Sequence, residues 1–267
     1  MARAIDGIVF DIDGCVARGN RAIPGVPDTL NELRRRGIRF VFITNDNQNE
    51  VAYWVHRLAA MGIATSEDEV LTAAIIAARA TRELYPTRKI LPIGDVGLIE
   101  ALRTQGLELL DLEDAKNAEV VVMGKDPDFD LRRVNLVCQA IWNGAEFIAT
   151  NDDPKVPTAT GFVPATGALV KAVAYATGKE PIVTGKPSKW AGEMAMKILG
   201  ISPDRGAVAG DRIPQDIAMG KRAGLFTILV LTGGTTQEEA ADAPEALKPD
   251  LILPDINHLL EWLDNPS

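Results

Sequence analysis

Short β-rich runs alternate with amphipathic helical patterns along most of this chain, and this alternation restricts the fold more than any single motif does. A strand followed by a helix and a further strand is typical of βαβ units, in which the strands pair in parallel and the helices cover the sheet. The clearest strand-like runs lie at 8–10, 39–43, 206–209 and 227–231. The pattern predicts an α/β protein with a doubly wound parallel sheet.

The middle of the chain repeats the alternation as a separate block. Its strand-like runs lie at 90–93, 119–123 and 146–150. A helical pattern at 67–84 precedes these runs, and a polar stretch at 151–167 that follows them is predicted to be a loop. We therefore predict a Rossmann-like core built from 1–81 and 182–267, with an α/β domain inserted at 82–181.

Charge and composition exclude several classes of protein. The net charge of −9 argues against a nucleic-acid-binding protein, which usually presents a basic face. No run approaches the roughly 18 apolar residues of a membrane-spanning helix, and the first residues lack the apolar stretch of a signal peptide. The two cysteines form no CxxC pair, which favours reduced thiols. We expect a soluble, cytoplasmic protein without nucleic-acid or membrane partners.

Polar side chains follow several predicted strands at their carboxyl ends, where open α/β sheets bind their ligands. These side chains are Asp11 and Asp13, Thr44 and Asn45, Lys186, and Asp211 and Asp216. Because the carboxyl ends of parallel strands meet at one edge of the sheet, the shared placement says more than any one motif.

Asp11-x-Asp13 is the sharpest of these signals. Mg²⁺ prefers oxygen ligands and commonly takes one or two carboxylates together with water and substrate phosphate. It would relieve the repulsion between the two acids and leave one carboxylate to attack phosphorus. The second acid could protonate the leaving oxygen and then activate water. An aspartate that caps a turn beside Gly14 is the alternative for this motif taken alone.

The other strand ends fit the same chemistry. Asp211 could be a further carboxylate ligand of the metal, and Asp216, about one helical turn later, could orient it. Lys186 could neutralise the nucleophile and the transferring phosphoryl group, and Thr44 and Asn45 could donate hydrogen bonds to phosphate oxygens. The alternatives are acidic residues at a helix N-terminus, a solvated lysine and a plain helix cap.

In their order and spacing, these segments resemble the haloacid dehalogenase (HAD) superfamily, within its NagD-like, or 4-nitrophenylphosphatase-like, branch that carries a large α/β cap. The matching segments are Asp11-Ile12-Asp13-Gly14, Thr44-Asn45, Gly185-Lys186-Pro187 and Gly210-Asp211-Arg212 through Asp216. Arg18-Gly19-Asn20 and Ile23-Pro24-Gly25 also resemble the stretch that follows the first motif in this branch. The resemblance covers nearly the whole chain, and the gap between Thr44 and Lys186 is where this branch carries its cap.

The resemblance implies a role for each residue. Asp11 is the implied nucleophile and Asp13 the implied general acid and base, while Thr44, Asn45 and Lys186 hold the phosphoryl group. The implied Mg²⁺ ligands are Asp11, the backbone carbonyl of Asp13, and Asp211, with support from Asp216. The cap is expected to close over the site and choose the substrate, with Asn151 and Asp152 lining the pocket.

The sequence departs from the branch at three places. Cys15 stands where the family usually has Thr or Val, and it would be open to oxidation if it were exposed. Ile213-Pro214-Gln215 replaces a more polar segment, which makes the role of Asp216 less secure. Asp46 adds negative charge beside the expected phosphate site.

We therefore expect a Mg²⁺-dependent phosphomonoesterase that hydrolyses a small phosphorylated metabolite through an aspartyl-phosphate on Asp11. The alternatives are a phosphoryl-accepting regulatory module, a metal-independent dehalogenase and a catalytically silent homologue. The dehalogenase needs no metal, so the pair of Asp13 and Asp211, which suits Mg²⁺, argues against it, and the chain is about twice the length of a receiver module. The sequence leaves the oligomeric state open, and a homodimer is one option.

Overall fold

The computed structural model describes residues 4–158 and 160–265, and these form two compact units. The first unit contains the chain up to Thr44, then Val51–Leu71, and everything from Lys186 onward. The second unit contains Asn45–Glu50 and Thr72–Gly185. The described residues contain no helix that is both long and apolar enough to cross a membrane.

The first unit is built on a six-stranded sheet in the order β15-β14-β13-β1-β4-β5. Its strands are β1 (Gly7–Asp11), β4 (Arg39–Thr44), β5 (Val70–Thr72), β13 (Gly206–Gly210), β14 (Phe226–Val230) and β15 (Leu251–Leu253). The chain builds outward from β1 to β5, then returns and builds outward on the other side from β13 to β15. β1 and β13 therefore lie side by side at the point where the strand order reverses.

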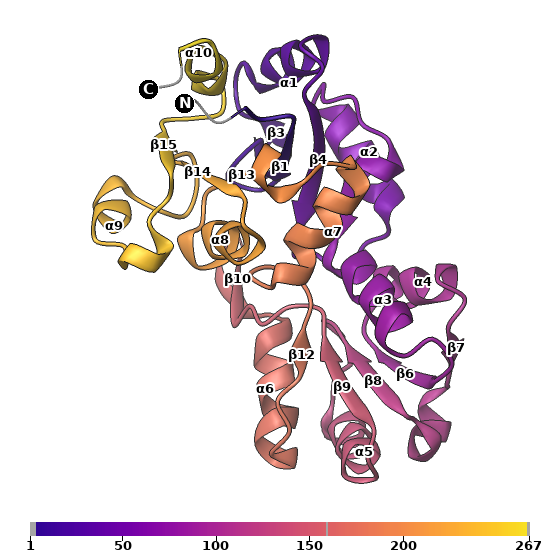
Figure 1. Cartoon of the computed structure of the whole chain (residues 1–267). Helices are drawn as coiled ribbons and strands as arrows, with labels where there is room; N and C mark the ends of the chain where they lie inside the picture. The colour runs from indigo at the N-terminus through magenta and orange to yellow at the C-terminus, as the bar shows by residue number, and fades with distance from the viewer. Residues whose placement is uncertain (1–3, 159, 266–267) are drawn as a thin grey trace. The chain divides into compact units, whose positions relative to one another are not determined.

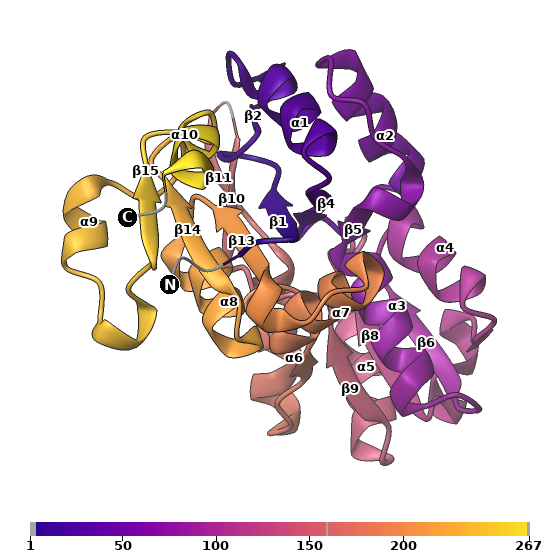
Figure 2. The same ribbon diagram turned by 45° about the horizontal axis from the view of Figure 1, so that its top comes forward.

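Helices cover both faces of this sheet, as Figures 1 and 2 show. One face packs on α1 (Val26–Arg35), α2 (Val51–Ala60) and α10 (His258–Asp264), whose apolar residues join Phe10 and Phe42 in one cluster. α7 (Lys189–Leu199) and α8 (Ala218–Ala223) pack on the opposite side, against β1, β4 and β14. Since helices bury both faces, all five residues of β1 are buried, and the doubly wound prediction is confirmed.

The second unit has its own parallel sheet, in the order β12-β9-β8-β6-β7. Its strands are β6 (Lys89–Ile93), β7 (Glu108–Leu109), β8 (Val120–Met123), β9 (Glu146–Ala149) and β12 (Ile182–Val183). Val121 and Met123 of β8 pack in the cluster that includes α5 (Leu131–Trp142) and α6 (Thr166–Thr177), whereas Val120 and Val122 pack in the cluster of α3 (Ala73–Leu84) and α4 (Val96–Thr104). Successive side chains point to opposite faces, so a continuous apolar strand is covered on both.

Smaller elements complete the two units. In the first unit these are the hairpin strands β2 (Ala17–Arg18) and β3 (Arg21–Ala22) and the helix α9 (Gln237–Ala241). Short 3₁₀ turns lie at Glu67–Glu69, Leu112–Asn117, Pro203–Arg205 and Glu245–Leu247.

The segment 67–84 is not one helix, contrary to the sequence-based prediction. Val70–Thr72 forms β5 because this β-rich triplet is fully buried at the edge of the first sheet. The helix α3 starts only after Thr72, whose side chain accepts a hydrogen bond from the Ile75 N–H and so caps it. The longer of the two segments of the second unit begins at Thr72, and Ala74 and Ala77 of α3 pack against the sheet of this unit.

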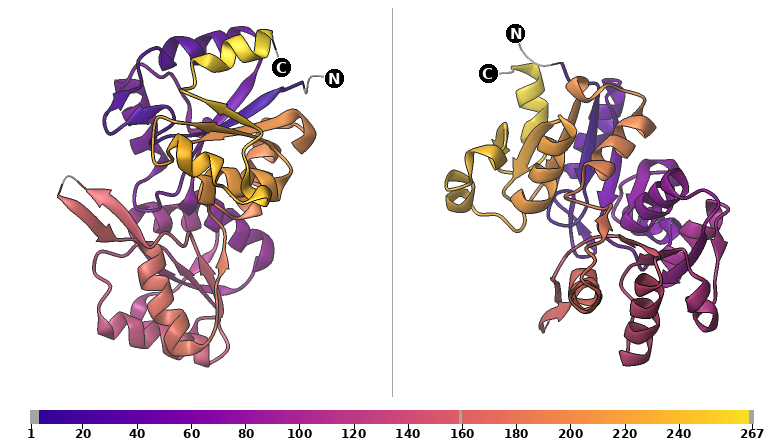
Figure 3. Two further views of the ribbon diagram at one scale, coloured as in Figure 1. Left: turned by 90° about the vertical axis from the view of Figure 1, so that its left-hand side faces the viewer. Right: turned by 60° about the horizontal axis from the view of Figure 1, so that its bottom comes forward.

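The polar stretch at 151–167 is also more ordered than the predicted loop. It contains an antiparallel hairpin of β10 (Lys155–Thr158) and β11 (Gly161–Pro164), and α6 begins at Thr166. The left panel of Figure 3 shows this hairpin projecting from the second unit. The ammonium of Lys155 lies 4.3 Å from the centre of the Phe162 ring, which is a cross-strand contact that polar composition alone does not predict.

Candidate active site

The reversal of strand order in the first unit creates the candidate site. Asp11 is the last residue of β1, and Asp211 directly follows the neighbouring β13. Both carboxylates are buried, with 7% and 4% of the residue surface exposed. Buried acids need partners, and the carboxyl ends of strands at a switch point are where α/β sheets bind ligands. The fold therefore places these two predicted residues together.

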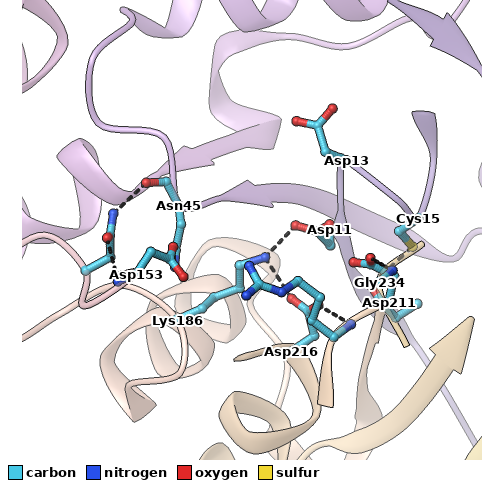
Figure 4. A network of polar contacts seen from close by, with 12 residues as sticks. Asp11, Asp13, Cys15, Asn45, Asp153, Lys186, Asp211, Asp216 and Gly234 are labelled. Atoms are coloured by element: carbon cyan, nitrogen blue, oxygen red, sulfur yellow. Dashed lines mark hydrogen bonds and ion pairs between the residues drawn. The ribbon is translucent and has the colours of Figure 1, made fainter. Parts of the chain in front are cut away.

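Lys186 is the positive centre of this cluster, as Figure 4 shows. Its Nζ contacts Oδ1 of Asp11 and lies 2.7 Å from Oδ1 of Asp216. The lysine side chain is only 4% exposed. Ser188 begins the helix that follows it, since the Ser188 hydroxyl accepts a hydrogen bond from the Trp190 N–H.

Asp216 is held by the unusual turn that the sequence shows after Arg212. Ile213–Ile217 forms a single π-helical turn, a feature often found at functional sites. The Arg212 N–H donates to Oδ2 of Asp216 at 3.1 Å, and Oδ1 faces Lys186. A side chain at Gly210 would place its Cβ 2.3 Å from Cγ of Asp216, so only glycine allows this approach. Asp216 therefore lies within the cluster even though this chain has a less polar segment before it than the family usually has.

The carboxylate of Asp211 lies in a cradle of glycines. The Gly234 N–H donates to its Oδ2 at 2.5 Å. A Cβ at Gly14 would lie 2.4 Å from Oδ2, and a Cβ at Gly233 would lie 1.9 Å from it. Side chains at these two positions would displace the carboxylate, so their absence fixes where Asp211 can sit.

The donor set fits a divalent cation. Carboxylate oxygens of Asp11, Asp211 and Asp216 all lie within 4.8 Å of one another, and Lys186 offsets only one of the three charges. Within the described residues, Oδ1 of Asp211 is buried without a hydrogen-bond partner. Such an orphaned oxygen is costly in a folded protein unless an ion or water satisfies it. A hard cation with oxygen ligands matches both the geometry and the excess charge.

Electrostatics in the cluster follow from burial. Desolvation raises the pKa of Asp11 well above its usual value, although the Lys186 ammonium opposes the shift. Burial, followed by the Asp216 carboxylate, raises the pKa of Asp211 to about 6. The buried lysine is held in its charged form, because Asp11 and Asp216 outweigh its desolvation and raise its pKa. The site is strained by unpaired negative charge, which a bound cation would relieve.

Asp13 does not join this cluster with its side chain. Its Oδ1 accepts a hydrogen bond from Nη2 of Arg57 at 2.6 Å, and 53% of the side chain is exposed. Figure 4 shows the Asp13 carboxylate directed away from Asp11 and Lys186. The predicted general acid is therefore near the predicted nucleophile in sequence, but its side chain contacts Arg57 instead.

The remaining predicted residues lie at the start of the second unit and in the first unit's β4. Thr44 is buried at the end of β4. The Asn45 amide donates to Oδ2 of Asp153 at 2.9 Å, and the Asn151 amide donates to the Asn45 carbonyl at 2.7 Å. Asn151 is buried and Asp152 is exposed. The structure brings Asn45 and Asn151 together and adds Asp153, which sequence reasoning had not singled out.

Cys15 is fully buried beneath the site. Its thiol donates a 3.4 Å hydrogen bond to the Ala209 carbonyl, and burial raises its pKa well above the usual range. Reactive cysteines need thiolate character and access, and this residue has neither.

Sequence reasoning also missed Arg57 and the glycine pair at 233–234. The glycines follow the predicted strand at 227–231, so their position at a strand end was a usable signal. Arg57 lies in the middle of a helix and offered none, because its role depends on the loop that faces it.

Two family models match the chain. One describes haloacid dehalogenase-like hydrolases and matches residues 8–108, and the other is HAD-hydrolase-like and matches residues 183–259. These spans contain all of the predicted catalytic and metal-binding residues, whereas Asn151 and Asp152 lie outside both.

Similar proteins align over nearly the whole chain. An acid sugar phosphatase of Staphylococcus saprophyticus is 32% identical over 96% of this chain and 97% of its own. The solved p-nitrophenyl phosphatase from Archaeoglobus fulgidus is 34% identical with a TM-score of 0.89, covering 97% of this chain and 99% of its own. NagD from E. coli K-12 is 28% identical with a TM-score of 0.87, covering 95% and 98%. With such matches from end to end, the chain belongs to the haloacid dehalogenase-like hydrolases and is an enzyme of their NagD-like phosphatase branch.

Proposed function

We propose that this protein is a Mg²⁺-dependent phosphomonoesterase that transfers the phosphoryl group of a small metabolite to Asp11 and then to water. The observation that carries the proposal is the contact of Asp11 with Lys186 at the switch point, beside the Asp211 carboxylate whose buried oxygen lacks a partner among the described residues. The phosphatases among its relatives support the reaction class.

The metal would be held by Asp11, Asp211 and the backbone carbonyl of Asp13. When bound, Mg²⁺ supplies positive charge that stabilises the phosphoryl oxygens in the transition state. Both carboxylate oxygens of Asp216 already accept hydrogen bonds, from Lys186 and from the Arg212 N–H. We therefore assign Asp216 to the support of Lys186 and of the neighbouring ligands rather than to direct coordination.

In the first step, a carboxylate oxygen of Asp11 forms a bond to phosphorus as the bond from phosphorus to the leaving oxygen breaks. Asp13, protonated at this stage, gives its proton to the leaving oxygen, and the alcohol departs. Lys186 stays charged and offsets negative charge on Asp11 and on the transferring group. Thr44 and Asn45 are the proposed donors to the phosphoryl oxygens.

In the second step, water attacks phosphorus and passes a proton to the Asp13 carboxylate. The bond from phosphorus to Asp11 breaks, which frees inorganic phosphate and restores the Asp11 carboxylate. Asp13 ends the cycle protonated, as it began, so atoms and charges balance. Asn151 and Asp152 remain the proposed substrate-binding residues of the second unit.

The first test is hydrolysis of 4-nitrophenyl phosphate by the purified protein with Mg²⁺, with EDTA, and in Asp11→Asn. We expect turnover that is lost on chelation, recovers with added Mg²⁺ and is absent from Asp11→Asn, whose folding is checked by circular dichroism. Asp11-dependent turnover that persists in EDTA would overturn the metal assignment. Absence of turnover on this substrate and on a panel of sugar phosphates and nucleotides would indicate a silent homologue.

A further inference from the structure

The carboxylate of Asp13 forms an ion pair with a residue on a helix of the same unit. Arg57 of α2 donates from Nη2 to Oδ1 of Asp13 at 2.6 Å and from Nη1 to Oδ2 at 3.3 Å. Such fork-shaped pairing of a guanidinium with a carboxylate fixes orientation as well as charge. The ion pair therefore defines one particular position of the Asp13 side chain.

Arg57 is held more firmly than its partner. Its Nη2 also donates to the Gly19 carbonyl at 2.7 Å, and its guanidinium carbon lies 4.6 Å from the centre of the Trp54 ring. The Arg57 side chain is 12% exposed, whereas that of Asp13 is 53% exposed. Because Arg57 has these additional contacts and Asp13 is the more exposed of the two, Asp13 is the partner that we expect to move.

This position is unproductive for acid catalysis. A general acid must come within hydrogen-bond reach of the leaving oxygen, which is attached to the phosphorus that Asp11 attacks. In Figure 4, however, the Asp13 carboxylate is directed away from Asp11. The carboxylates that approach one another within 4.8 Å are Asp11, Asp211 and Asp216, and Asp13 is not among them. Proton delivery consequently requires Asp13 to leave Arg57.

We propose that Arg57 is a positioning residue that holds Asp13 in a withdrawn position and competes with its delivery to the leaving oxygen. The proposal rests on the proposed function, because it assigns to Arg57 an effect on the acid of that reaction. If part of the enzyme has Asp13 in the withdrawn position, kcat/KM for a substrate that needs the acid is multiplied by the fraction of enzyme in which Asp13 can reach the leaving oxygen. A partly exposed ion pair of this kind changes such a population about two- to fivefold.

The leaving group provides the readout. 4-Nitrophenolate leaves readily without a proton, whereas the alkoxide of glycerol 2-phosphate leaves only when it is protonated. The kcat/KM of each substrate reports the steps up to departure of the alcohol and excludes the later hydrolysis of the aspartyl-phosphate. The ratio of kcat/KM for glycerol 2-phosphate to that for 4-nitrophenyl phosphate therefore measures the contribution of acid catalysis by Asp13. This ratio is also independent of the fraction of folded enzyme.

Arg57→Met is the main variant, because methionine keeps an apolar stem against Trp54. We expect the ratio to rise about two- to fivefold, and to rise less in Arg57→Lys, which keeps the charge but loses the fork. The matched control is Arg205→Met, which breaks the exposed fork between Arg205 and Asp6 beside the amino end of β1. In this control the ratio should match that of the wild type.

A ratio that is unchanged or lower in Arg57→Met would overturn the proposal. An equal loss on both substrates would mean that Arg57 only attracts the substrate, and it would overturn the proposal as well. Failure of the proposed function looks different, since neither substrate would then show Asp11-dependent turnover. A structure with Mg²⁺ and orthovanadate tests the proposal without turnover: we expect Asp13 to have left Arg57, and an intact pair would contradict the assignment.

Discussion

The Lys186 ammonium lies 2.7 Å from Oδ1 of Asp216 while it also contacts the Asp11 carboxylate. Asp216 is fully buried, and its other oxygen accepts the Arg212 N–H. The lysine is thus held between the proposed nucleophile and an acid on the π-helical turn. This acid fixes the lysine's position and keeps it charged.

Replacing the lysine tests this arrangement. Lys186→Met should lower kcat for 4-nitrophenyl phosphate by about 100-fold or more, because it removes a preorganised charge beside the transferring group. It should also lower the free energy of unfolding in EDTA at pH 8 by about 3 kcal/mol, since Asp11 and Asp216 lose their buried counter-charge. Urea unfolding measures the second effect. Unchanged stability would show that the acids do not depend on the lysine.

Removing a carboxylate from the same cluster should have the opposite effect on stability. The folded pKa of Asp211, about 6, lies above the reference value of 3.8. Between these values the folded, metal-free protein keeps a proton that the unfolded chain has lost, so the ionised carboxylate destabilises the fold as the pH rises through this range. Asp211→Asn should therefore equal the wild type below pH 4. Its free energy of unfolding should be higher by about 3 kcal/mol above pH 7 in EDTA, at 1.36 kcal/mol per pH unit.

Urea unfolding of both proteins from pH 4 to pH 8 measures this difference. A stability difference that does not depend on pH would contradict the buried, ionised Asp211.

The glycine cradle predicts a selective defect in metal use. Gly233→Ala places a Cβ 1.9 Å from Oδ2 of Asp211 and should raise the Mg²⁺ concentration needed for half-maximal activity about 10- to 100-fold. Gly234→Ala is the matched control, because its Cβ would lie 3.3 Å from the same oxygen and its N–H is retained. Activity titrations with Mg²⁺ distinguish the two variants. Equal behaviour of both would argue against a metal ligand at Asp211.

Substitutions at two neighbouring residues of the second unit, Asn151 and Asp152, should separate an effect on stability from an effect on substrate choice. Asn151→Ala removes the hydrogen bond that a buried side chain donates to the Asn45 carbonyl and should lower the free energy of unfolding by about 1–3 kcal/mol. Asp152→Ala alters an exposed side chain and should leave stability unchanged while it changes the ranking of substrates. Thermal unfolding and a panel of phosphate esters measure the two effects. An unaltered ranking would remove Asp152 from the proposed substrate-binding set.

Much of the fold followed from local pattern. The strands at 8–10, 39–43 and 206–209 were predicted because continuous apolar runs bounded by helices are typical of parallel strands covered on both faces. Val70–Thr72 was missed because three residues carry too little periodicity to compete with the helical pattern around them. The hairpin at 155–164 was missed because its polar residues resemble a loop, and only the pairing between the two strands makes them β structure.

The sequence by itself determined which strand ends carry the chemistry, because parallel pairing forces Asp11 and Asp211 to the same edge of the sheet. Only the tertiary structure decided which way the side chains turn. Lys186 and Asp216, which form an ion pair, are 30 positions apart in the sequence, and Arg57 and Asp13 are 44 positions apart. Side-chain directions depend on contacts between elements that are distant along the chain, and no local pattern encodes them. The position of Asp11, the proposed nucleophile, could therefore be predicted from its strand, whereas the direction of the Asp13 side chain could not.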